Sequence, residues 1–220
     1  LPTENDPAVL GLVDMQDGNR FIPLTETRCW NFQDGTMAHW LDDTSLIYND
    51  TVDGTFASIV LDVHTRARRV VPFPIAAVSP DGRWAIAINY ARLRLTRADY
   101  GYGGPGQDAR RDETWPADDG LWLIDLATGE GRLTVSIAST RNRMPDSRKS
   151  TALSYFCHVK FSPDSRRVFW LARTAGDGPL KTTAFVCDRD GGNVVRCFPD
   201  GWGGSHFNWL DRNRLLVTAN

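Results

Sequence analysis

The chain has 220 residues, 41% of them hydrophobic, and a formal net charge of −2 with both signs spread along its length. This composition is typical of a globular protein that forms one domain or part of a larger one. The balanced charge argues against a nucleic-acid-binding surface, which needs a basic stripe. The lack of any run of about 18 apolar residues argues against a membrane-spanning helix.

The chain begins with Leu1 rather than Met, and no charged-then-apolar leader follows it. We therefore expect the true N-terminus to be missing or processed, and the compartment stays open between cytoplasm and periplasm. The four cysteines show no C-x-x-C spacing. This argues against a zinc-ribbon-like metal cluster and leaves disulfides open.

Two hairpin patterns alternate along the chain. In one, an apolar strand is followed by Asp, a Gly- or Thr-bearing turn and a second strand; it occurs at 11–18, 59–65, 121–129 and 184–192. In the other, an aromatic or apolar residue precedes a turn with Asp and an apolar strand; it occurs at 40–48, 78–88, 161–170 and 209–217. Pro presets φ in such turns, Asp bonds back to the turn backbone, and Gly takes the positive φ.

Taken in chain order, the hairpins predict an all-β protein with hardly any helical periodicity. Two hairpins in tandem form a four-stranded antiparallel sheet, and sheets that repeat every 40–50 residues or so are β-propeller blades. Residues 1–220 then form one propeller region, and its second blade is stretched by an insertion at 92–117. The predicted units are a half blade at 10–24, complete blades at 30–73, 75–135 and 155–198, and a half blade at 205–220.

The two half blades would together complete one more blade and close a four-bladed ring. Propellers range from about four to eight blades, and larger rings are commoner. We therefore expect a fragment of a larger ring of about seven blades. Such a fragment would have open sheet edges.

The Ser-Pro-Asp-Gly/Ser-Arg turns at 79–83 and 162–166 resemble the repeats of TolB-type (PD40, WD40-like) propellers. More narrowly, the chain resembles an uncharacterised bacterial propeller family related to oligogalacturonate lyase. The segments that carry this likeness are 30–35, 78–89 with 92–94, 100–102 and 205–209. The resemblance implies a propeller and suggests carbohydrate binding, although the turn motif itself says little about activity.

His158 and His206 each lie three residues before the aromatic residue that opens a blade. They therefore occupy equivalent positions, where we expect side chains to line the mouth of the central channel. His39, directly before Trp40, is close to this pattern but out of register. Alternatively, each histidine bonds the neighbouring blade and fixes its packing.

In the lyases that this chain resembles, channel histidines bind a divalent metal such as Mn, and a further His is the catalytic base. The resemblance makes His158 and His206 candidate metal ligands or catalytic residues. The sequence departs from the family pattern, because the approach at 200–205 contains neither a second His nor a Gln. Two imidazoles fall short of the three or more protein ligands expected of a metal site.

The insertion supplies further candidates for ligand binding: Arg92, Arg94, Tyr100 and Tyr102. Arginine forks bind carboxylates at two points, and flat tyrosine rings suit sugars. Long loops on rigid scaffolds commonly carry function. These residues suggest an acidic saccharide or another small anion as the ligand. Alternatively, the insertion is a solvated loop whose charges balance locally. Gln33 precedes an inner strand and is a candidate hydrogen-bonding group in the channel.

Two hypotheses follow. The first is a non-catalytic propeller that binds a small molecule, an oligosaccharide or a protein partner at one face. The second is a lyase that eliminates across a glycosidic bond next to a uronic acid. In that scheme His158 or His206 is the base or a metal ligand, and Arg92 or Arg94 clamps the carboxylate.

Overall fold

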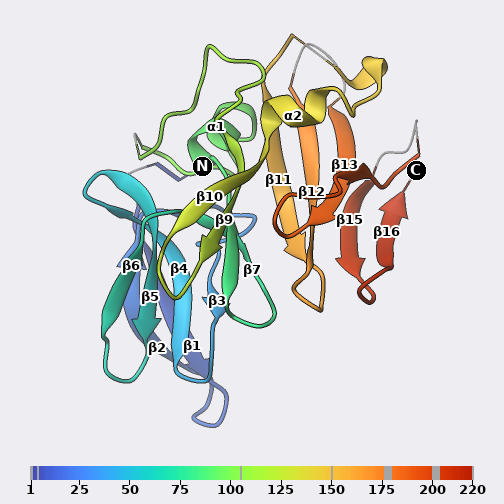
Figure 1. The fold of residues 1–220 in the computed structure, drawn as a ribbon. Helices are drawn as coiled ribbons and strands as arrows, with labels where there is room; N and C mark the ends of the chain where they lie inside the picture. Colours follow the sequence, from blue (N-terminus) through green and yellow to red (C-terminus); the bar gives the residue numbers. More distant parts are fainter. Residues whose placement is uncertain are drawn as a thin grey trace.

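The computed structural model describes residues 2–3, 5–104, 106–149, 151–175, 180–199 and 204–219. Within these ranges, antiparallel strands form three four-stranded sheets and a two-stranded hairpin at either end (Figure 1). The first sheet contains β3 (His39–Trp40), β4 (Ser45–Val52), β5 (Thr55–Asp62) and β6 (Arg68–Val71). The second contains β7 (Ile75–Val78), β8 (Trp84–Ala87), β9 (Gly120–Asp125) and β10 (Gly131–Ser136). The third contains β11 (Ser154–Phe161), β12 (Arg167–Thr174), β13 (Lys181–Asp188) and β14 (Val195–Arg196).

The terminal hairpins are β1 (Ala8–Asp14) with β2 (Arg20–Thr27), and β15 (Gly204–Trp209) with β16 (Leu215–Ala219). They lie at opposite ends of the row of sheets and form separate two-stranded sheets (Figure 1). The described residues therefore form no closed ring. The predicted all-β fold of four-stranded antiparallel blades is confirmed, whereas the number of blades in a complete ring stays a prediction.

The repeated turns have the chemistry that the sequence predicts. Ser79 Oγ donates to Asp81 Oδ1 at 2.5 Å and accepts from the Trp84 N–H at 2.9 Å. Asp81 also accepts from the Arg83 N–H, and Gly82 has a φ of 67°. The copy at 162–166 repeats these bonds, with Ser165 at a φ of 60° in place of the glycine. Both turns thus satisfy their own backbone groups.

The predicted all-β character holds, and short helical segments lie in the connections between strands. Helix α1 (Tyr90–Thr96) follows β8, α2 (Ile137–Arg141) follows β10, and the 3₁₀ turn η1 (Asp146–Arg148) precedes β11. Asn89 caps α1 by accepting from the Arg92 N–H at 2.9 Å. The sequence hides this helix because its polar residues Arg92, Arg94 and Thr96 alternate with apolar ones, which is the two-residue period of a strand.

The core lies between consecutive sheets. Strands β7 and β11 pack against each other, and aromatic residues fill the third sheet's interior, where Trp170 stacks on Phe185 with ring centroids 5.4 Å apart. Trp170, Phe169 and Phe185 are fully buried. None of the helices in the described ranges combines the length and the apolar character needed to cross a membrane.

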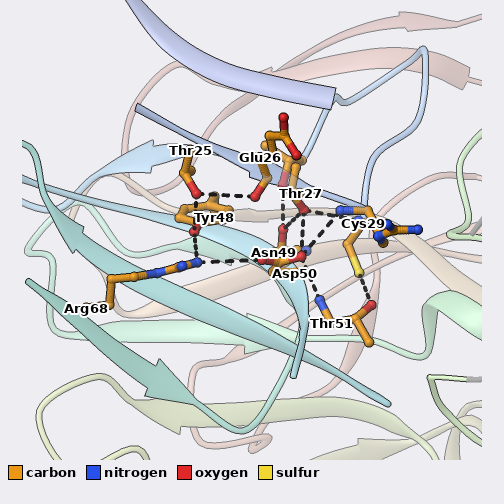
Figure 2. Close-up of polar contacts among 11 residues, drawn as sticks. Thr25, Glu26, Thr27, Cys29, Tyr48, Asn49, Asp50, Thr51 and Arg68 are labelled. Atoms are coloured by element: carbon orange, nitrogen blue, oxygen red, sulfur yellow. Dashed lines mark hydrogen bonds and ion pairs between the residues drawn. The ribbon is translucent and has the colours of Figure 1, made fainter. Parts of the chain in front are cut away.

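A polar network fastens the N-terminal hairpin to the first sheet (Figure 2). Thr27 Oγ1, at the end of β2, donates to the Asn49 carbonyl at 2.7 Å and to Asp50 Oδ1 at 3.1 Å. Arg68 donates to the Tyr48 hydroxyl and lies 3.7 Å from Asp50. These bonds hold β2 beside β4, although the two strands belong to different sheets.

Candidate functional site

A cavity of about 370 Å³ lies where the first strands of the three sheets come together. Its walls come from the loop before β3, from β7, from α1 and from β11, and most of its lining side chains are apolar. The polar or charged side chains among them are Asp34, His39, Tyr90, Tyr100, His158 and Lys160. In a propeller this position faces the central channel.

His158 enters the cavity from a β-bulge. The register of β11 against β12 shifts between Cys157 and Lys160, and His158 has a φ of 55°. Such bulges redirect a side chain. The imidazole centroid lies 5.2 Å from the Tyr100 ring and 6.0 Å from Phe207. Its Nδ1 is buried and has no hydrogen-bond partner among the described residues. An unpaired polar atom of this kind is costly unless a ligand satisfies it.

Burial lowers the pKa of His158 to about 4, and the positive charges of Arg173 and Arg97 add to the effect, with smaller contributions from His206 and Lys160. The imidazole is therefore neutral at pH 7. A neutral ring can both donate and accept a hydrogen bond. The charges that lower its pKa also make this end of the cavity positive.

His39, on β3, lines the same cavity. Its Nε2 is buried and, within the described part of the chain, has no hydrogen-bond partner. Burial lowers its pKa, so this ring is neutral as well. The cavity thus presents two neutral imidazoles with unpaired nitrogens, from strands of two different sheets.

Tyr100 is held in place by Arg97. The guanidinium lies 4.6 Å from the tyrosine ring centroid and donates to both carboxylate oxygens of Asp99, at 2.9 and 2.7 Å. Burial raises the pKa of Asp34, another lining residue, and the nearby charge of Asp99 raises it further. The cavity lining therefore includes the carboxyl group of Asp34 as well as the neutral imidazole of His158, on which the charges of Arg97 and Arg173 act.

His206, the other predicted channel histidine, is exposed on β15. It lies near enough to His158 to contribute to the lowered pKa of that residue. In the described ranges, no group of three or more His, Cys, Asp and Glu side chains could hold a metal ion. Among the described residues, His158 and His206 are therefore not accompanied by the further side chains that a metal site needs. Residues 200–203 of the predicted approach lie outside the described residues. The cysteines at 29, 157, 187 and 197 are free thiols.

Arg92 does not reach the cavity. It is 1% exposed, and its five N–H groups donate to the carbonyls of residues 109, 110, 113, 114 and 154 at 2.5 to 3.3 Å. No donor is left to clamp a carboxylate. The guanidinium ties the insertion to β11. The expected role of Arg92 in ligand binding stays a prediction, and this bonding pattern does not favour it.

Tyr102 and Arg94 are also engaged by the protein. Tyr102 is fully buried, accepts from Asn49 Nδ2 at 2.8 Å and stacks on Tyr90 with centroids 4.2 Å apart. No ring face of Tyr102 is open to a sugar. Arg94 donates to the carbonyls of Ala98 and Pro2. Gln33 is exposed in the loop before β3, beside the lining residue Asp34.

Sequence reasoning therefore found His158 and Tyr100 and missed several of their neighbours. His39 was noticed but set aside for its register. Arg97 lies in the insertion with Arg92 and Arg94, and nothing in the sequence pattern distinguishes it from them; Asp99 is one of several acidic residues there. Arg173, which is 7% exposed on β12, reads in the sequence as an ordinary strand residue. Only the fold brings these charges to His158.

No protein-family model matches the chain, and the search of curated proteins finds no match. Solved structures do match. A structure described as oligogalacturonate lyase in complex with manganese is 16% identical, with a TM-score of 0.60 over 100% of this chain and 57% of that one. The tricorn protease is 13% identical, with a TM-score of 0.54 over 94% of this chain and 17% of that one. TolB from Acinetobacter baumannii is 12% identical, with a TM-score of 0.44 over 83% of this chain and 36% of that one.

These comparisons define the class of protein: the chain has the β-propeller fold. The propeller fold that the predicted resemblance implies is confirmed by the match to the oligogalacturonate lyase structure. The chain spans between about a sixth and just over half of the length of these solved proteins. Identities of 12 to 16% carry the fold and no activity.

Proposed function

We propose that this propeller is a binding protein that takes a small carboxylate-bearing molecule into the cavity between β3, β7 and β11. One observation carries the proposal: His39 Nε2 and His158 Nδ1 line the same cavity, and both are buried without a partner among the described residues. Buried polar atoms are normally hydrogen-bonded. A ligand that bonds to both nitrogens would remove the penalty of leaving them unpaired.

The charges around His158 favour an anionic group at that end. Arg97, Arg173 and Lys160 all act on His158 as positive charges. Arg97 is paired with Asp99, whereas Arg173 lies close to no carboxylate among the described residues. A carboxylate beside His158 would thus meet a positive potential in a partly desolvated site. The apolar wall from β7 and β11 would contact the body of the ligand. An acidic saccharide such as a uronate is the first candidate, with the pyranose ring against that wall.

The competing hypothesis is a metal-assisted lyase. The manganese in the similar lyase structure belongs to that protein. The described residues of this chain do not fit such a site, since no three ligating side chains converge. A histidine with a pKa of about 4 is also a weak base at neutral pH, because proton abstraction is most efficient when the catalytic pKa lies near the working pH. Both observations favour binding over catalysis.

The test is calorimetric titration with galacturonate and trigalacturonate, each with and without MnCl₂. The variants are His39→Ala, His158→Ala and, as a matched control, the exposed His64→Ala. We expect saturable binding without metal that falls at least about tenfold in the first two variants, since a lost hydrogen bond to a charged group costs about 1.5–3 kcal/mol. Binding that survives both substitutions would refute the assignment of the cavity. Formation of unsaturated uronate in the presence of Mn would favour the lyase hypothesis.

A further inference from the structure

A second cavity, of about 440 Å³, lies between the first and second sheets beneath the insertion. Its floor includes Phe73 and Trp122, whose ring centroids are 5.7 Å apart. Its roof is formed by residues 106–108, Arg110, Asp118 and Asp119. Neither the sequence patterns nor the first cavity accounts for it.

The roof is fixed by hydrogen bonds. The Gly106 carbonyl accepts from the Phe56 N–H at 2.8 Å, and a side chain at Gly106 would collide with the Phe56 ring. Asn89 Nδ2 donates to the Asp108 carbonyl and to Asp119 Oδ2, the latter at 2.9 Å. The insertion is thus seated on both sheets, and the polar groups of the cavity have defined positions.

Hydrogen-bond acceptors outnumber donors in this cavity. Asp119 is 6% exposed and carries a buried carboxylate, and the Oε1 of Gln107 is buried with no partner in the described part of the chain. The lining also includes the carboxylates of Asp108 and Asp118, against one guanidinium, that of Arg110. The lining is therefore net negative.

The guanidinium of Arg110 is a cation that the carboxylates at this cavity already stabilise. Its guanidinium contacts Asp108, Glu113 and Asp118. The same residue has a φ of 48°, a conformation that is uncommon for a residue other than glycine. Arg110 pairs with the outer carboxylates. Asp119 accepts from Asn89 Nδ2, and Gln107 Oε1 has no partner in the described part of the chain, so both can accept from a further donor.

We propose that this cavity binds a primary ammonium group on a short alkyl chain, which is the chemistry of a lysine side chain or of a free alkylamine. Three N–H donors match the Asp119 carboxylate, Gln107 Oε1 and one outer carboxylate. The faces of Trp122 and Phe73 attract a cation and cover its alkyl stem. The site is independent of the carboxylate-binding cavity, and its net charge would repel that cavity's ligand.

Binding is tested by NMR of the ¹⁵N-labelled protein, with the Trp122 indole N–H as reporter, assigned by its absence in Trp122→Phe. The probes are n-butylammonium chloride and Nα-acetyl-lysine methylamide, with n-butanol as the neutral control. We expect saturable shifts with one or both ammonium probes and none with n-butanol. Binding of the lysine derivative alone would identify a peptide as the source, and equal binding would identify the ammonium group itself as sufficient. Shifts with n-butanol equal to those of n-butylammonium, or no saturable shift with either ammonium probe, would overturn the proposal.

Two variants separate binding from folding. Asp119→Asn keeps an acceptor for Asn89 and removes the charge, so affinity should fall at least about tenfold. Gln107→Leu removes a buried acceptor that has no hydrogen-bond partner among the described residues. The free energy of unfolding should therefore stay the same or rise, while the affinity for the ammonium probe falls. Asp43→Asn, at an exposed turn, is the matched charge control and should bind like the parent protein. If Gln107→Leu and a folded Asp119→Asn both bind like the parent protein, the proposal fails.

Discussion

Replacing Arg92 with Met tests whether this residue serves the fold. The side chain donates to five backbone carbonyls, at 2.5 Å to Ser154, 2.7 Å to both Arg110 and Glu113, 3.0 Å to Thr114 and 3.3 Å to Ala109. A hydrogen bond to a charged group contributes about 1.5–3 kcal/mol. Five such bonds cannot be additive, because the sum would reach the whole stability of about 5–15 kcal/mol that a domain has.

Burial of the guanidinium is unfavourable, and it lowers the pKa of Arg92. Met fills a similar volume without this desolvation cost, so the substitution regains part of the stability lost with the hydrogen bonds. We therefore expect the free energy of unfolding to fall by about 4 kcal/mol, which is at the upper end for a single substitution. Arg94→Met is the matched control on the same helix. It loses two carbonyl contacts at a partly exposed side chain, so its cost should stay below about 1 kcal/mol.

The assay is urea denaturation of both variants, together with hydrogen exchange of the amides at 106–119. Arg92→Met should speed exchange throughout this segment, because the bonds that seat it on β11 are gone. Arg94→Met should leave that exchange unchanged. If the two variants differ by less than about 1 kcal/mol, the inferred role of Arg92 is wrong.

Three further predictions concern single side chains. Tyr102→Phe should lower the free energy of unfolding by about 1–3 kcal/mol in thermal melts, because a buried N–H of Asn49 loses its acceptor, whereas Tyr100→Phe should not. Trp84→Ala should destabilise by about 1–2 kcal/mol more than Trp40→Ala, since Arg83 and Arg189 lie 4.9 and 4.7 Å from the Trp84 ring and Trp40 is 55% exposed. His158 should titrate by NMR with a pKa of about 4, below its ordinary 6.5. The fold therefore carries no penalty for protonating this ring above pH 6.5. The free energy of unfolding declines as pH falls from 6.5 to about 4, because the unfolded chain binds the proton first. His158→Gln should remove that part of the pH dependence, and an unchanged profile would contradict it.

The repeat made the fold predictable. Turns such as Ser79 to Arg83 carry their structure in a few adjacent residues, so the hairpins follow from local chemistry. Helix α1 did not follow, since its burial depends on β11 and on the insertion above it. The end hairpins were also predictable, whereas the fact that they stay apart depends on the path of the whole chain.

Position in the repeat made His158 predictable as a residue of the site. His158 falls at a fixed place before a blade's aromatic residue, and the structure lines the cavity with it. Nothing in the sequence says which way a side chain of the insertion points. Arg92 and Arg97 are five residues apart. Arg92 donates its N–H groups to backbone carbonyls, whereas Arg97 contacts the Tyr100 ring and lowers the pKa of His158. Composition could not distinguish them.

The positive and negative charges of the insertion balance along the sequence but lie at different cavities in the structure. The basic Arg97 acts toward the cavity at His158, while Asp108, Asp118 and Asp119 line the cavity above Trp122. A net charge of −2 for the whole chain therefore averages over one site that favours anions and another that favours cations. Low-dielectric walls focus the field of each cavity on its own interior, and salt screens exposed charges that lie more than about 10 Å apart. Tyr90 and Leu93 of α1 line the first cavity, Asn89 just before the helix lines the second, and the buried Arg92 between them donates all its N–H groups to carbonyls. The packing of α1 therefore contributes to both sites.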